Sequence, residues 1–288
     1  MEIEVKGHSG CDISVAREQD SLYVYKSTYD VKYISRLLKQ ADKQQKAADL
    51  EYQHIRVPKI FDVMSDERHA TIKMQYVYSK NFVEYFEQSG FEQIDYLIHA
   101  IEYFVEKELL QSPVRRVPKE IFIEKFEDVR SKTLIKPEMA EDVQVKELMQ
   151  RAAVVFESMD DWQIPVGWCH GDLTFSNILF NGNNYYLIDF LDSYVETPLQ
   201  DIVKIRQDTA YRWSQLMYMQ SCDSVRLRII FDKIDREVDA YFSERYEWYR
   251  LYYKPMQLMN LLRILPYATE HRVIDYLKTI ISQLLNEI

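Results

Sequence analysis

The sequence contains little glycine, little cysteine, no long apolar run and no excess of positive charge. Its 288 residues include only 6 glycines and 3 cysteines, Cys11, Cys169 and Cys222. The cysteines have no C-x-x-C spacing, which argues against a structural zinc site or a disulfide framework. Three scattered cysteines are typical of a protein from a reducing compartment, so we expect a cytoplasmic location.

The charge and hydropathy of the chain exclude two classes of partner. The formal net charge is -10, so we expect no nucleic-acid partner. No segment approaches the roughly 18 uninterrupted apolar residues of a membrane span, and the N-terminal MEIEVKGHSG has no signal-peptide core. The composition predicts a soluble globular protein that does not associate with a membrane, and it leaves the oligomeric state open.

The pattern of apolar residues predicts an α+β protein. Strand patterns and one long helix fill the first eighty residues, and helix patterns dominate the rest. We therefore expect an N-terminal lobe over residues 1–78, with a small antiparallel sheet, and a mainly helical C-terminal lobe over residues 79–288. The expected strands are 2–5, 12–15, 22–26, 57–63 and 69–77. The expected helices are 33–52, 94–110, 141–159, 200–219, 225–242, 244–264 and 271–285.

A polar segment, HGDLTFSN at residues 170–177, lies between two apolar runs. Asp, Ser and Asn often hydrogen-bond their own backbone in loops, so one interpretation is a capped turn. The other interpretation is a catalytic loop that carries Asp172 and Asn177.

The next segment predicts a β-hairpin, because Asn181 and Gly182 separate two apolar runs. If its loop is centred on Asn183, Asn177 lies directly opposite Asp189, with Cβ atoms about 5 Å apart. Two oxygen-bearing side chains at that separation can hold Mg²⁺. Asp172 could then face the same cation and accept a proton from a substrate hydroxyl, as in phosphoryl transfer.

These motifs carry a family resemblance. HGDLTFSNILF followed by YLIDFLD resembles the HGDxxxxN and IDF motifs of the aminoglycoside phosphotransferase and choline kinase superfamily. The resemblance implies a protein-kinase-like bilobal fold and an ATP- and Mg²⁺-dependent kinase that phosphorylates a hydroxyl of a small molecule. It implies that Asp172 is the catalytic base and that Asn177 and Asp189 are the magnesium ligands.

The resemblance also assigns a nucleotide site in the N-terminal lobe. It makes Lys26, near the end of the third expected strand, the lysine that contacts the α- and β-phosphates. The segment KGHSG occupies the position of the phosphate-covering loop, and MQYV that of the hinge that meets the adenine. The expected nucleotide-binding residues are Lys26, Gly7, Ser9, Gly10, Met74 and Tyr76.

One departure from the family supports a different function. The family usually has a glutamate on the long N-terminal helix that pairs with the lysine, and here Asp42 or Gln44 falls nearest the expected spacing. Without such a pair, the chain could be a nucleotide-binding pseudokinase that acts as a regulatory scaffold. Protein phosphorylation is disfavoured, because the short interval from Asp189 to Pro198 leaves little room for an activation segment.

The acceptor is less defined by the sequence. Asp192 follows the expected metal ligand and could bind an amine or a sugar hydroxyl, or be a solvated loop residue. The stretches MQYV, NFVEYFE and RILPYA resemble kinases of bacterial surface-polysaccharide sugar metabolism, which favours a sugar or sugar derivative. A choline- or ethanolamine-type amino alcohol or an aminoglycoside is also consistent with the family.

Two further features of the C-terminal part have two interpretations each. Arg263 either holds an anionic group of the substrate or is a structural arginine paired with a carboxylate. The aromatic run at 241–253 forms either a ligand surface or helix core.

Overall fold

The computed structural model describes residues 3–6, 11–50 and 52–288 and divides the chain into two compact units. Unit 1 consists of Met1–Phe104 and His170–Asp192, and unit 2 consists of Val105–Cys169 and Ser193–Ile288. Strands concentrate in unit 1 and helices in unit 2, so the predicted α+β class is confirmed. The lobe boundary near residue 78 stays a prediction.

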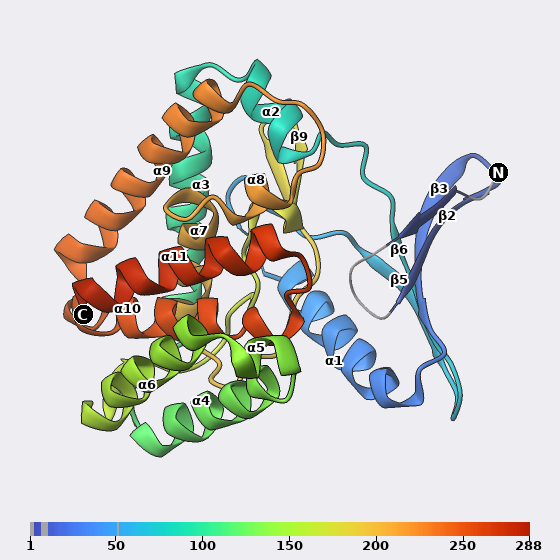
Figure 1. Ribbon diagram of the computed structural model, residues 1–288. Coiled ribbons are helices and arrows are strands. Elements are labelled where there is room, and N and C mark those ends of the chain that lie inside the picture. The colour runs from blue at the N-terminus through green and yellow to red at the C-terminus, as the bar shows by residue number, and fades with distance from the viewer. Residues whose placement is uncertain (1–2, 7–10, 51) are drawn as a thin grey trace. The chain divides into compact units, whose positions relative to one another are not determined.

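Unit 1 contains an antiparallel five-stranded sheet with a long helix packed on it (Figure 1). The strand order is β1-β2-β3-β6-β5, and α1 packs on this sheet. These five strands match the five expected from the sequence. Their bounds are β1 (Ile3–Lys6), β2 (Asp12–Glu18), β3 (Ser21–Thr28), β5 (Ile60–Ser65) and β6 (Ala70–Gln75).

The helix α1 (Val31–Ala48) begins where Asp30 accepts a hydrogen bond from the backbone N–H of Lys32, as an N-cap does. Its buried residues Leu37 and Ala41 belong to the same apolar cluster as Ile72 and Met74 of β6. The helix therefore lies with one fixed face against the sheet, and this packing determines which of its polar residues reach the strands.

A second, smaller sheet in unit 1 has the order β4-β10-β9. It consists of β4 (Ile55–Arg56), β9 (Ile178–Asn181) and β10 (Asn184–Leu187). The helix α2 (Phe82–Gln88) packs against β9 and begins with a reciprocal capping box between Asn81 and Glu84. The helix α3 (Phe91–Leu109) follows.

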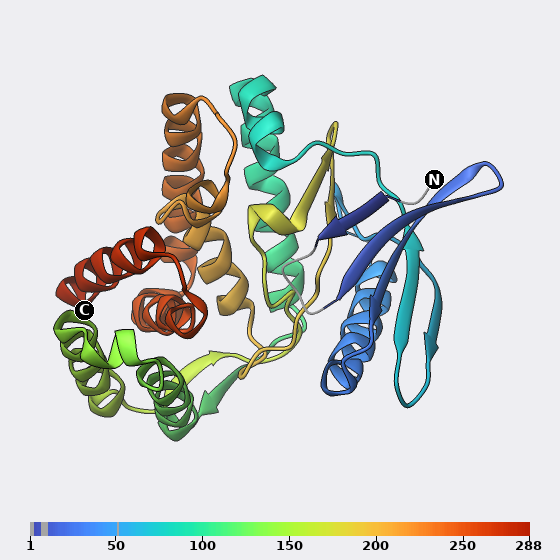
Figure 2. The same ribbon diagram turned by 45° about the vertical axis from the view of Figure 1, so that its right-hand side comes forward.

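Unit 2 is mainly helical. Its helix α10 is buried along its second half, and α7, α9 and α11 pack around it (Figure 2). Among the described residues, no helix is long and apolar enough to cross a membrane. The helices are α4 (Lys119–Leu134), α5 (Pro137–Glu141), α6 (Val143–Ser158), α7 (Pro198–Thr209), α8 (Trp213–Met217), α9 (Ser224–Arg245), α10 (Glu247–Leu262) and α11 (His271–Glu287).

Unit 2 differs from the sequence-based expectation in three places. The helices α4 and α5 lie almost wholly in a stretch, 111–140, for which no helix was expected. The strands β7 (Val114–Val117) and β8 (Trp162–Pro165) form an antiparallel pair that the sequence analysis did not predict. The expected helix 200–219 is two helices, α7 and α8, separated at Arg212, whose φ of 53° is left-handed. A left-handed residue cannot continue a right-handed helix, so the chain changes direction there.

Candidate active site

All the candidate catalytic and metal-binding residues belong to unit 1. His170 is fully buried and fixes the start of the candidate catalytic loop. Its Nδ1 accepts a hydrogen bond from the backbone N–H of Asp172 (3.2 Å), and its Nε2 donates to the carbonyl of Ile188 (2.9 Å). A ring that accepts at one nitrogen and donates at the other is neutral. The imidazole thus links the loop to the residue that follows β10.

Gly171 has a φ of 89°, in the left-handed region that favours glycine. A Cβ at this position would lie 2.1 Å from the carbonyl oxygen of Leu191. The sequence therefore needs glycine here for two reasons, backbone conformation and close approach. The left-handed backbone of Gly171 turns the chain directly before Asp172.

Asn177 is held directly on Asp172. Its amide nitrogen donates to the carboxylate Oδ2 of Asp172 (2.9 Å) and to the backbone carbonyl of the same residue (2.8 Å). Both contacts use the nitrogen of the amide, so the amide oxygen stays available as a ligand atom. The structure thus brings together the two residues that the sequence placed in one loop.

The hairpin brings Asp189 to the site by a different route from the one predicted. Asn181 pairs with Asn184, so the loop has two residues, with Gly182 in the left-handed region at φ 57°. The centre lies between Gly182 and Asn183, and Ile188, not Asp189, lies opposite Asn177 and donates to its carbonyl (3.1 Å). The predicted register was wrong by one residue.

Asp189 lies just beyond β10, and its own φ of 61° is left-handed. A non-glycine residue in this region is uncommon and interrupts the alternation of side chains along a strand. Such backbone outliers cluster at functional sites. The carboxylate of Asp189 lies 2.7 Å from the Nζ of Lys26, so this residue joins the hairpin to the five-stranded sheet of unit 1.

Lys26 lies on β3 and is 5% exposed. Besides the ion pair with Asp189, its Nζ donates to the Oε1 of Gln40 on α1 (3.2 Å). The helix partner of the lysine is therefore Gln40, and neither Asp42 nor Gln44. Asp42 pairs with Lys46 on the exposed face of α1, and Gln44 donates to the carbonyl of Pro58.

A second lysine, which comes from α1, also reaches the candidate site. Lys43 is 8% exposed, and its Nζ donates to the carbonyl of Leu191 (2.6 Å). Lys43 was not among the site residues predicted from the sequence. Lys43 stands in a polar stretch of the helix, where the sequence gives no sign that it is buried. Its burial follows from the way α1 packs on the sheet.

The predicted nucleotide residues are placed as follows. Met74 is buried within β6 and pairs with β3 and β5, and a nucleotide role for Met74 and Tyr76 stays a prediction. Tyr76 is the first residue after β6 and stacks edge-on against Tyr78 (5.0 Å between centroids). Gly7, Ser9 and Gly10 lie outside the described residues.

The acidic residues after Asp189 have separate environments. Asp192 is exposed, and its carboxylate lies 3.8 Å from the Nζ of Lys39. In unit 2, the carboxylate of Glu196 accepts from the backbone N–H of Ser193 and from the thiol of Cys169, which is a structural role. A substrate role for Asp192 stays a prediction.

The aromatic run at 241–253 is mostly helix core. Phe242 and Tyr249 are at most 1% exposed, and Trp248 and Tyr253 are below 9%. Of the two interpretations of this run, core packing accounts for these four rings.

The donor set fits magnesium. Among the described residues, no group of three or more His, Cys, Asp and Glu side chains could hold a metal on its own. Magnesium does not need such a cage, because it binds to one or two carboxylates, other oxygens and substrate phosphates. The Asp189 carboxylate and the free amide oxygen of Asn177 are ligand atoms of this kind.

We expect Gly171→Ala to unfold the candidate loop locally or the protein globally. The new Cβ would meet the Leu191 carbonyl, and the left-handed backbone adds strain of about 1 kcal/mol or more. A fall in melting temperature of several degrees should follow, measured by thermal unfolding. Gly90→Ala is the matched control, since nothing lies within 4 Å of a Cβ at Gly90. Equal melting temperatures for the two variants would contradict the assigned constraint.

A comparison with protein families gives one match, over residues 31–220, to a family described as "Phosphotransferase enzyme family". The matched range contains Asp172, Asn177 and Asp189. A search of curated proteins found no match.

Solved structures share the fold at low sequence identity. Aminoglycoside phosphotransferase APH(4)-Ia, in a ternary complex with AMP-PNP and hygromycin B, is 10% identical with a TM-score of 0.64, over 99% of this chain and 93% of that chain. A putative fructosamine-3-kinase from Haemophilus somnus is 12% identical with a TM-score of 0.63, over 99% and 91%. Amicoumacin kinase hAmiN, in complex with AMP-PNP, Ca²⁺ and Ami, is 12% identical with a TM-score of 0.61, over 99% and 88%.

Proposed function

Because this chain belongs to the phosphotransferase enzyme family, we propose that it transfers the γ-phosphoryl group of ATP to a hydroxyl of a small molecule, with magnesium as cofactor. We favour a sugar or sugar derivative as the acceptor. The observation that carries the proposal is the pair of contacts in unit 1 that link Asp172 to Asn177 and Lys26 to Asp189. The complexes of two of the similar structures with AMP-PNP support ATP as the donor.

Asp172 is the proposed catalytic base. Phosphoryl transfer depends mostly on positioning and charge stabilisation, so the base must be held in a fixed orientation toward the acceptor hydroxyl. Two hydrogen bonds hold it, from its N–H to the His170 ring and from the Asn177 amide to its carboxylate, and the left-handed Gly171 before it fixes the turn. The carboxylate orients the hydroxyl and accepts its proton.

Asn177 and Asp189 are the proposed magnesium ligands, and Lys26 is the proposed phosphate contact. A bound magnesium ion would neutralise charge on the phosphates. Lys26 is buried, and its contact with the carboxylate of Asp189 orients its ammonium group. Lys26 can exchange this ion pair for a phosphate oxygen, which releases the Asp189 carboxylate for metal binding.

The test is a turnover screen with magnesium and ATP against sugars, amino alcohols, nucleosides and aminoglycosides. We expect ADP formation that depends on one acceptor class and is lost without magnesium. An absence of turnover with every class, together with magnesium-independent nucleotide binding, would support the pseudokinase scaffold.

The neutral helix partner of Lys26 is the observation that favours that alternative, and it can be tested by substitution. A hydrogen bond to a charged group contributes about 1.5–3 kcal/mol. We therefore expect Gln40→Ala to raise the KM for ATP roughly tenfold, with a smaller effect on kcat. The control is Gln45→Ala on the exposed face of the same helix. An unchanged KM for ATP in Gln40→Ala would show that Gln40 does not position Lys26 for nucleotide.

A further inference from the structure

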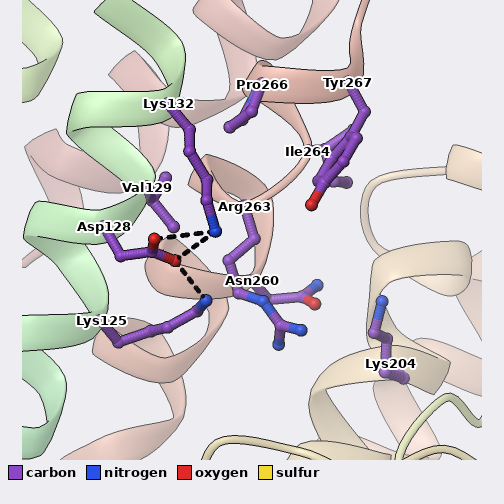
Figure 3. Close-up of a pocket in the computed structure, with 10 residues that line it drawn as sticks. All are labelled: Lys125, Asp128, Val129, Lys132, Lys204, Asn260, Arg263, Ile264, Pro266 and Tyr267. Atoms are coloured by element: carbon purple, nitrogen blue, oxygen red, sulfur yellow. Dashed lines mark hydrogen bonds and ion pairs between the residues drawn. The ribbon is translucent and has the colours of Figure 1, made fainter. Parts of the chain in front are cut away.

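Unit 2 contains a pocket of about 200 Å³ with a concentration of positive charge (Figure 3). Four of its ten lining residues are cationic, Lys125 and Lys132 from α4, Lys204 from α7, and Arg263 at the end of α10. Asp128 is the one acidic residue among the ten, so the lining carries a net charge of +3. On a chain with a net charge of -10, this local excess of positive charge needs an explanation.

Asp128 does not neutralise the pocket. Its carboxylate pairs with Lys125 (2.8 Å) and with Lys132 (2.8 Å), as the dashed lines in Figure 3 show. Hydrogen bonds from Lys125 and Lys132 lower the pKa of Asp128, and the contact with Asp128 raises the pKa of Lys132. Asp128 and Lys132 are therefore charged at neutral pH. One carboxylate holds two ammonium groups together at the same side of the pocket.

Arg263 differs from Arg206 of the same unit in its contacts. Arg206 is 8% exposed and pairs through Nε and Nη2 with both carboxylate oxygens of Asp235 (2.9 Å each). Within the described part of the chain, Arg263 makes no ion pair; its guanidinium lies 5.3 Å from the centre of the Tyr194 ring. Of the two interpretations of Arg263 from the sequence, the structure therefore does not support the paired structural arginine.

The chemistry of the lining selects a phosphate group as the occupant. An unpaired guanidinium offers a planar fork of donors that matches phosphate oxygens, and lysines add point charges. A net charge of +3 balances a dianionic phosphate monoester better than a single carboxylate. The volume is several times the ≈30 Å³ that a water molecule occupies in the liquid, so a phosphate and part of a larger molecule fit.

The rest of the lining suits an organic group attached to that phosphate. Asn260 is buried, and its Nδ2 donates to Gln207 (2.7 Å), which leaves its amide oxygen to accept a hydrogen bond from a hydroxyl. Tyr267 is 77% exposed and, with Pro266, provides an apolar part of the lining (Figure 3). Cationic, polar and apolar groups together match a phosphorylated polyol.

We propose that this pocket binds the phosphate group of a sugar phosphate or a similar phosphate monoester. The lining residues of unit 2 alone carry this assignment, which goes beyond the function proposed above.

Binding is tested first without ATP, by isothermal titration of inorganic phosphate and of glucose 6-phosphate. We expect both probes to compete for one site, with affinity lowered tenfold or more in Arg263→Gln and in Lys132→Gln. Arg228→Gln and Lys146→Gln, at exposed positions outside the pocket, are the matched controls and should bind as wild type does. Lys26→Met excludes binding at the nucleotide site and should also leave the affinity unchanged.

Binding that is absent, or equally strong in Arg263→Gln and Arg228→Gln, would overturn the pocket assignment.

Discussion

Asp172→Ala is expected to lower kcat by roughly 10²–10⁴, the usual effect of losing a general base. The affinity for ATP should change little, because Asp172 is proposed to contact the acceptor hydroxyl and not the nucleotide. Steady-state kinetics with the identified acceptor, alongside calorimetric titration of ATP, separates the two effects. A fall in kcat without a fall in ATP affinity is the signature of a residue that acts in the chemical step.

The matched control is Asp160→Ala, which removes an exposed carboxylate from the other unit and should keep full activity. Asp172→Asn adds a stricter comparison, because it keeps the size of the side chain and removes its basicity. Full turnover in either Asp172 variant would show that another group accepts the proton.

Asp189→Ala is expected to have an effect at least as large, because it removes a proposed magnesium ligand and the ion-pair partner of Lys26. We expect magnesium-dependent ATP turnover to fall by roughly 10³-fold or more, and nucleotide binding to lose its dependence on magnesium. Turnover is measured as ADP release over a magnesium titration, and binding is measured over the same titration with a non-hydrolysable ATP analogue.

Asp62→Ala is the control for a carboxylate of unit 1 outside the site, since Asp62 is exposed on β5. The double variant Lys26→Met, Asp189→Ala tests the coupling of the ion pair. If the two residues act on the same nucleotide, the loss in the double variant should be much smaller than the product of the two single losses. A magnesium dependence in Asp189→Ala equal to that of wild type would rule out this ligand.

The parts of the site that could be predicted are those fixed by local sequence. Asp172 and Asn177 are five residues apart in one loop, and Gly171 marks the left-handed position that turns it. The five strands of the first sheet could also be read from their alternating residues, because each half-buried strand has a strong period-two pattern.

The parts that could not be predicted depend on register and on packing between distant segments. The hairpin loop contains an Asn-Gly pair followed by two more Asn residues, and a shift of the centre by half a residue changes which residues face one another. The sequence shows nothing that marks the left-handed φ of Asp189, which compensates for the shift and directs its carboxylate to Lys26. The short pair β7–β8 lacked a turn signal, because its strands lie more than forty residues apart.

The helix partner of Lys26 also depends on packing between distant segments and could not be predicted from the sequence. Spacing along the chain suggested Asp42 or Gln44, but Leu37 and Ala41 are the residues that pack into the sheet. With those positions on the buried face, Gln40 lies beside Lys26, and Asp42 lies on the exposed face. Tertiary packing sets the orientation of a helix on a sheet. The residue spacing known from the family therefore does not predict which side chain reaches the lysine.

The measurement that tests the central claim most directly is ³¹P NMR of the purified protein with magnesium, ATP and a pool of small metabolites. A pool is suitable because it offers many hydroxyl compounds to the protein at once. We predict that the wild-type protein produces ADP together with a new phosphate-ester resonance, and that Asp172→Asn produces neither. A wild-type protein that binds ATP but forms no phosphate ester, in a pool that contains the free sugars and their monophosphates, would contradict the account and favour the scaffold.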